Sequence, residues 1–158
     1  MKIRLTQLSD LSFVLDAERH ADNAPYINQW SIAQHERAIA SSDEGHFIAE
    51  KAGTLMGYLI VAGLQDPHQA LLLRRIVAVE KGQGYGRAML KWVKSYTFEQ
   101  LNYHRLWLDV VASNQRAQNL YLSEGFAVEG TLRKAYKSQC GFEDMLILSL
   151  LRSEFDRL

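Results

Sequence analysis

The sequence predicts a single α/β domain that spans residues 1–158 and contains about seven strands and about four helices. Apolar residues switch between the two-residue period of strands and the 3.6-residue period of helices, in the order β-α-α-β-β-β-α-β-α-β-β. The 158 residues contain no internal repeat, low-complexity tract or linker, and 47% of them are hydrophobic. A chain of this length can bury one sizeable core, so we expect one domain with a mixed sheet.

The first half of the chain predicts two early helices followed by a meander. Ser9 and Asp10 are N-cap candidates, and Ser31 with Gln34 forms a capping-box pattern. Gly53 indicates a turn between two strands. The expected elements are a strand at 2–6, a helix from about 9 to 21, a loop at 20–30, a helix at 31–40, and strands at 46–51 and 55–64.

The second half predicts strands that alternate with helices. Arg74 and Arg75 interrupt an apolar strand, and strand alternation places one on each face of the sheet. A structural ion pair is the favoured role for them over substrate binding. The expected elements are a strand at 70–79, a helix at 85–96, a strand at 105–111, a helix at 113–124 ended by Gly125, and strands at 126–133 and 144–151 around a polar loop at 134–143.

Composition argues against several functions. Lys plus Arg equals Asp plus Glu at 18 each, which argues against a general binder of nucleic acid or of membrane surfaces. No apolar run approaches the ~20 residues of a membrane span, and the polar start is not a signal peptide. The single Cys140 suits a reducing cytoplasm, and the five histidines lack metal-site spacing. We expect a cytoplasmic protein without a metal.

A glycine-rich turn, EKGQGYGRAML, occupies residues 80–90 between a strand and a helix. Such a turn exposes N–H groups at a helix N-terminus, and glycine lets a phosphate approach them closely. Dinucleotide and Walker loops are excluded, because Arg87 and Met89 stand where those motifs need a small residue. Alone, the turn is equally compatible with a diphosphate site and with tight packing of helix on sheet. Arg87 adds a positive charge that favours the diphosphate.

A second segment, LWLDVVASNQRAQNLYLSEGF at 106–126, makes the pattern specific. The chain resembles the GNAT superfamily of N-acetyltransferases. The pyrophosphate loop of that family, Arg/Gln-x-x-Gly-x-Gly/Ala, is matched at 81–86 with Lys81 in first place, and its Asn-x-x-Ala-x-x-x-Tyr-x-x-x-Gly-Phe segment is matched at 114–126. Residues 106–126 and the C-terminal stretch resemble the branch that acetylates ribosomal-protein N-termini, and the latter also resembles its small-molecule relatives.

The resemblance implies a mostly antiparallel sheet whose central strands splay apart around acetyl-CoA. Backbone groups near Arg75 and Ile76 would pair with the pantetheine arm, and one such N–H would polarise the thioester carbonyl. Amides of 82–87 would bind the diphosphate. The expected cofactor-binding residues are Arg75, Ile76, Lys81, Gly82, Gln83, Gly84, Tyr85, Gly86, Arg87, Asn114 and Tyr121.

Two side chains are catalytic candidates. Tyr121 would protonate the departing thiolate, and it shares a helix face with Asn114 and Ala117; its alternative role is a core tyrosine. Asp109 stands where the N-terminal acetylating branch has a glutamate proposed as the base. Because aspartate is one methylene shorter, a bridging water could carry the proton. The alternative roles of Asp109 are a surface carboxylate and a hydrogen-bonding strand residue.

The acceptor is expected to be a primary amine of a peptide N-terminus or of a small molecule. The resemblance implies a pocket between the loops at 20–30 and 134–143. An edge strand near the C-terminus could support a homodimer. The competing hypothesis is a non-catalytic acyl-CoA-binding module, which would carry the same pyrophosphate loop without the chemistry.

Overall fold

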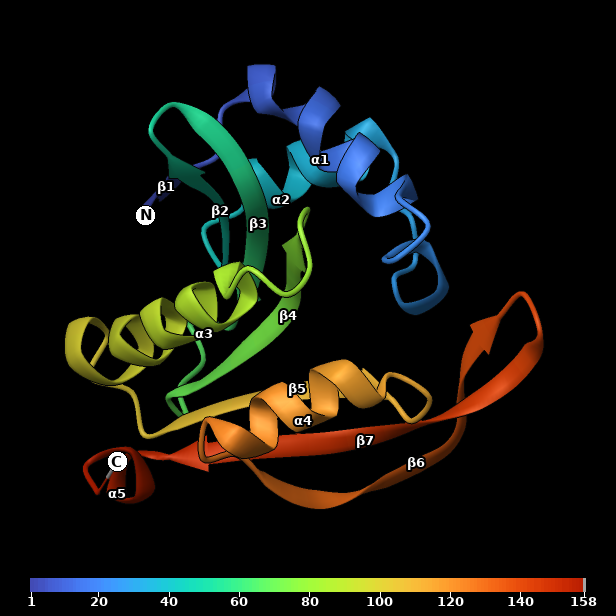
Figure 1. Ribbon diagram of the computed structural model, residues 1–158. Helices are drawn as coiled ribbons and strands as arrows, with labels where there is room; N and C mark the ends of the chain where they lie inside the picture. The colour runs from blue at the N-terminus through green and yellow to red at the C-terminus, as the bar shows by residue number, and fades with distance from the viewer. Residues whose placement is uncertain (158) are drawn as a thin grey trace.

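The computed structural model describes residues 1–157, and within them the chain forms one seven-stranded sheet flanked by helices (Figure 1). The strand order is β1-β2-β3-β4-β5-β7-β6, and all neighbours are antiparallel except β4 and β5. The strands are β1 (Lys2–Leu5), β2 (Glu44–Lys51), β3 (Thr54–Ala62), β4 (Ala70–Ala78), β5 (Arg105–Val111), β6 (Ala127–Ser138) and β7 (Gly141–Leu151). The helices are α1 (Leu11–Arg19), α2 (Ile32–Ala40), α3 (Tyr85–Ser95), α4 (Gln115–Ser123) and α5 (Arg152–Phe155).

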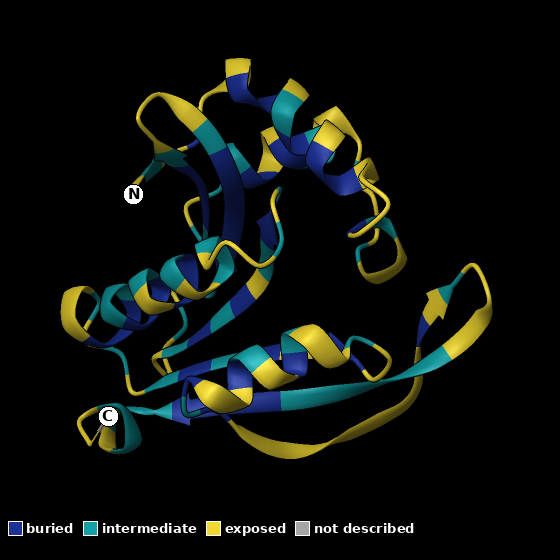
Figure 2. Ribbon diagram, in the orientation of Figure 1, coloured by how far each residue is buried: buried dark blue, intermediate teal, exposed yellow. Residues whose placement is uncertain are grey.

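The sheet buries apolar residues on both faces. Helices α3 and α4 pack on one face over a large core that includes Leu71, Leu106 and Leu148. Helices α1 and α2 cover part of the other face over a smaller core around Val14 and Ile60. Figure 2 shows the buried residues concentrated along the central strands. None of the helices within residues 1–157 is long and apolar enough to cross a membrane.

The predicted helix signals are present in the structure. Ser31 and Gln34 form a reciprocal capping box, with each side chain accepting the backbone N–H of the other. Gly125 follows α4 with a φ of +93°, which a residue with a side chain rarely adopts. Helix α1 differs, because a 3₁₀ turn at Leu8–Asp10 precedes it. The short helix α5 was not predicted.

The prediction of a polar loop at 134–143 is wrong, because β6 and β7 continue through this segment as a hairpin. Tyr136 pairs with Glu143 and Ser138 with Gly141, so the connection is a tight turn that contains the exposed Cys140. Most of β6 is exposed (Figure 2). Strand segments outside the core need no apolar alternation, and the sequence pattern therefore gave no sign that the two predicted strands continue into 134–143.

A β-bulge in β4 changes the expected direction of the two arginines. Ile60 pairs with Arg75 and Val61 with Leu73, so Arg74 is the extra residue. Both arginines therefore turn toward the α1–α2 side, where Arg74 pairs with Glu44 and Arg75 with Glu18. The prediction of one arginine on each face is wrong, and the preference for ion pairs is confirmed.

Strands β4 and β5 part after a short parallel ladder. Their pairing runs from Ala70 and Arg105 to Leu72 and Trp107 and then ends. Beyond this point the two strands diverge, as Figure 1 shows. The splayed centre of the sheet is thus confirmed, and the opening between β4 and β5 positions the site.

Candidate active site

A cleft of about 860 Å³ follows the gap between β4 and β5. Its walls come from the β4–α3 turn, the start of α4, the loop after α1, and β6. It collects every predicted site residue except Gln83: Arg75, Ile76, Lys81, Gly82, Gly84, Tyr85, Gly86, Arg87, Asp109, Asn114 and Tyr121. Segments that are far apart in the chain therefore meet at one opening.

The glycine-rich turn presents backbone amides to this cleft. Gly82 and Gly84 both have φ of +78°, and nothing lies within 4 Å of a Cβ placed on either. Gly86 is helical, and its added Cβ would meet only Leu120, at 3.7 Å. Tight packing of helix on sheet therefore explains none of the three. Since the first N–H groups of α3 have no intrahelical partner, the turn is suited to an anion that approaches from the cleft.

Three basic side chains, those of Lys81, Arg87 and Arg116, lie around the turn. The first two form polar contacts within the protein. Lys81 donates to the Asn23 side chain and, at 2.9 Å, to the Ala78 carbonyl. Burial and the neighbouring charge of Arg116 lower the pKa of Lys81. Arg87 pairs with Glu124, the residue directly after α4, so much of its charge is neutralised within the protein.

Arg116 is a cleft residue that sequence reasoning missed. It lies in the first turn of α4 and lines the cleft, close enough to Lys81 to affect its pKa. Its position two residues after Asn114, at the start of the recognised segment, was the available signal.

Tyr121 projects from α4 into the inner end of the cleft. It is 6% exposed, and its ring centroid lies 5.9 Å from that of Phe126. Burial, together with the charge of Asp109, raises the pKa of its phenol above the ordinary value. Tyr121 is therefore protonated at neutral pH and can donate a proton.

Asp109 lies on β5 opposite Ile147 of β7, with its side chain at the open cleft. The residue surface of Asp109 is exposed, yet the surrounding protein desolvates the carboxyl enough to raise its pKa. The charge of Arg74 acts in the opposite direction without cancelling this effect. A raised pKa makes the carboxylate a better proton acceptor.

Asn114 has a structural role at the start of α4. Its Oδ1 accepts the Ala117 N–H at 3.2 Å and caps the helix. Its Nδ2 remains to donate to a pantetheine carbonyl, as the resemblance implied.

Aromatic and polar groups from the loop after α1 and from β6 also line the cleft. Tyr26 and Trp30 come from the loop after α1, and Tyr136 comes from β6, with its hydroxyl 3.5 Å from the Pro25 carbonyl. Lys134, in the segment 134–143, forms an ion pair with Asp144 at 3.8 Å and does not line the cleft.

A model of the acetyltransferase (GNAT) family matches residues 14–126. The chain belongs to this family. It is 27% identical to a spermidine N(1)-acetyltransferase from Vibrio cholerae, over 98% of this chain and 95% of that protein. It is 29% identical to the ribosomal protein bS18 alanine N-acetyltransferase of Escherichia coli, over 86% of this chain and 90% of that protein.

A solved structure has the same fold as this chain. The Vibrio cholerae spermidine N-acetyltransferase in complex with CoA and spermine superposes with a TM-score of 0.87, at 23% identity over 98% of this chain and 96% of that one. The predictions of a GNAT fold, of acetyl-CoA as cosubstrate and of N-acetyl transfer are confirmed by the family assignment and these relatives.

Proposed function

We propose that this chain transfers the acetyl group of acetyl-CoA to a primary amine of a polyamine, with Tyr121 as the acid and Asp109 as the base. The observation that carries the polyamine assignment is the lining of the cleft. Asp109 has no ion-pair partner among residues 1–157, and three aromatic rings, those of Tyr26, Trp30 and Tyr136, line the same cleft. A carboxylate with aromatic faces favours an alkylammonium ligand.

The neutralised arginines support the same acceptor. Arg74 and Arg75 line the cleft, and either free guanidinium would repel a polycation. Glu44 and Glu18, which do not line the cleft, pair with them. The wall therefore repels an ammonium group much less than its arginines suggest, and the carboxylate of Asp109 can attract it.

The reaction follows from the positions of the two catalytic groups. Asp109, directly or through one water, accepts a proton from the amine nitrogen, whose lone pair then forms a bond to the thioester carbon. Backbone N–H groups of β4 near Arg75 and Ile76 stabilise the resulting oxyanion. As the carbon–sulfur bond breaks, Tyr121 donates its proton to the sulfur, and the Tyr121 phenolate takes up the second proton that the nitrogen loses in forming the amide. The products are the acetamide and free CoA thiol.

On the cofactor side of the cleft, the backbone of 82–87 holds the diphosphate. Lys81 and Arg116 add positive charge beside it. Asn114 fixes the pantetheine arm through its amide. These contacts direct the thioester between Tyr121 and Asp109.

An acceptor panel tests the proposal. Thiol release from acetyl-CoA is measured with spermidine, spermine, putrescine, an alanine-starting peptide and an aminoglycoside. We expect the highest kcat/KM with a polyamine. Turnover with the peptide alone would refute the polyamine assignment, and an N-terminal acceptor would replace it. Tight CoA binding by calorimetry without turnover on any amine would favour the non-catalytic acyl-CoA-binding module.

The role of Asp109 is tested by pH. Because a base works only when deprotonated, kcat/KM should fall as the pH drops through the raised pKa of Asp109. Asp109→Asn should lower kcat/KM by roughly 10²-fold or more and remove this acidic limb. Asp109→Glu is the matched control, since it keeps the carboxylate and should keep the limb. An Asp109→Asn profile with the same limb would remove Asp109 from the base role.

A further inference from the structure

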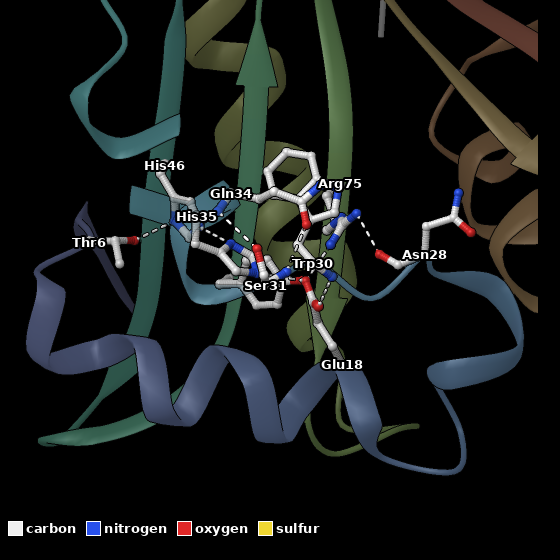
Figure 3. Close-up of polar contacts among 10 residues, drawn as sticks. Thr6, Glu18, Asn28, Trp30, Ser31, Gln34, His35, His46 and Arg75 are labelled. Carbon is white, nitrogen blue, oxygen red and sulfur yellow. Dashed lines mark hydrogen bonds and ion pairs between the residues drawn. The ribbon is translucent and has the colours of Figure 1, made fainter. Parts of the chain in front are cut away.

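A buried polar network joins α1, α2 and the sheet beside the cleft (Figure 3). Thr6 Oγ1 lies 2.8 Å from His46 Nδ1, and His46 Nε2 lies 3.1 Å from His35 Nδ1. His35 Nε2 is 3.1 Å from Glu18 Oε1, which in turn pairs with Arg75. Both imidazoles and the Glu18 side chain are almost fully buried, so each proton in this chain needs a partner.

The two histidines connect Thr6 to Glu18 through their ring nitrogens. The Glu18 carboxylate only accepts, so the side of His35 that faces Glu18 Oε1, at 3.1 Å, carries a proton on Nε2. Between the two rings, either His46 Nε2 donates to His35 Nδ1 or the reverse, and the Thr6 hydroxyl accordingly donates to His46 Nδ1 or accepts from it.

Glu18 is the end point of the network. It is 1% exposed and also accepts the Tyr58 hydroxyl at 2.6 Å and the Trp30 N–H at 3.0 Å. Burial raises the pKa of Glu18, but hydrogen bonds from His35 and Tyr58 and the charge of Arg75 outweigh it, so the net pKa is lowered. The carboxylate stays ionised and holds Arg75 in one position.

Arg75 is the point at which this network reaches the cleft. Its Nη2 donates to the Asn28 carbonyl at 2.9 Å, and its guanidinium lies 4.4 Å from the centroid of the Trp30 ring. Arg75, Asn28 and Trp30 all line the cleft, whereas Glu18 and the histidines do not. One guanidinium thus connects a fully buried carboxylate to two residues of the acceptor wall.

We propose that Arg75 is a positioning residue for the amine acceptor, because buried Glu18 fixes its guanidinium and Arg75 in turn fixes Asn28 and Trp30 at the wall of the cleft. This inference rests on the proposed acetyl transfer and adds the residue that shapes its acceptor side. The predicted role of the Arg75 backbone beside the pantetheine arm is separate, since the side chain points to the α1 side.

The guanidinium geometry explains why an arginine stands here. Its planar fork donates to Glu18 and Asn28 at once while its face stacks on Trp30. A lysine has one ammonium and no planar face. It can neutralise Glu18, but it cannot reach the Asn28 carbonyl and stack at the same time.

The test compares Arg75→Lys and Glu18→Gln with a control, Thr6→Val. Thr6→Val removes the hydrogen bond at the far end of the same buried network and does not contact residues 27–30, so it reports the effect of lost stability alone. Glu18→Gln frees Arg75 without changing a cleft residue, and it keeps the test valid should Arg75→Lys fail to fold. The measurements are KM for spermidine, KM for acetyl-CoA, thermal stability, and amide hydrogen exchange of residues 27–30.

Arg75→Lys and Glu18→Gln should raise KM for the amine by ~tenfold or more and leave KM for acetyl-CoA within about twofold. Arg75→Lys should speed exchange of the Trp30 amide although its acceptor, Glu18, stays in place, whereas Glu18→Gln changes that acceptor directly and is judged by KM alone. Thr6→Val should lower the melting temperature with neither effect. Equal KM and exchange in all variants, or the same KM change in Thr6→Val, would overturn the proposal. If the wild-type protein acetylates no amine, the proposed function fails, and the exchange rates still decide whether Arg75 holds the loop.

Discussion

His46 makes the stability of this protein depend on pH in a way that can be calculated. The side chain is 2% exposed, and burial, with the nearby charges of His35 and Arg75, lowers its pKa from 6.5 to about 4. Glu18 and Asp10 act in the opposite direction without cancelling this. Replacing it by glutamine, His46→Gln, removes the titrating group and keeps a donor and an acceptor.

The sign follows from proton binding. Below about pH 6.5 the unfolded chain binds a proton at His46 that the folded protein does not. The free energy of unfolding therefore decreases as the pH is lowered. The fall ends near pH 4, where the folded protein binds the proton as well. At about 1.4 kcal/mol per pH unit, this interval corresponds to a loss of about 3 kcal/mol.

Urea denaturation between pH 7 and pH 4 measures this loss. The free energy of unfolding of the wild-type protein should fall by about 3 kcal/mol more than that of His46→Gln over this range. Carboxylates such as Asp10 and Glu18 titrate in both proteins, so their contributions largely cancel in the difference. The control is His68→Gln at an exposed histidine, which should follow the wild type. Parallel curves for wild type and His46→Gln would refute the reasoning.

Three further predictions concern the site and its supports. Tyr121→Phe should lower kcat by ~10²-fold or more while calorimetry gives an unchanged CoA affinity; an unchanged kcat would remove Tyr121 from the acid role. Gly84→Ala, at φ +78°, should lower the free energy of unfolding in urea by ~1–2 kcal/mol. Gly86→Ala should weaken CoA binding without lowering stability, since its added Cβ meets only Leu120 at 3.7 Å. Glu124→Gln should lower stability by ~3 kcal/mol in the same assay, because it leaves the charge of Lys94, 6% exposed, without its carboxylate; a loss below ~1 kcal/mol would contradict this.

Short-range patterns were enough to predict most of the fold and the cofactor side of the site. The switch of period placed the strands and the four longer helices, and the capping box at Ser31 and the stop at Gly125 were read directly. The spacing of Asn114, Ala117 and Tyr121 predicted one helix face, and all three line the cleft. These features depend on residues within a few positions of one another.

The acceptor side depended on contacts that no local pattern contains. Glu18 and Arg75 are 57 residues apart, and whether a buried arginine meets a carboxylate is decided by packing. The bulge at Arg74 turned both arginines to one face, which strand alternation could not predict. The tip of the β6–β7 hairpin, at 134–143, carries no apolar alternation, because it buries little against the core.

The sequence by itself determined the order of elements, the glycine turn and the tyrosine that lines the same cleft, because each is set by backbone preferences and by the spacing of nearby side chains. Only the tertiary structure decided which buried charges pair, that His35 and His46 are in contact, and which residues form the acceptor wall. A buried charge is stable only beside a partner, and partners from distant segments are brought together by the packing of the whole sheet.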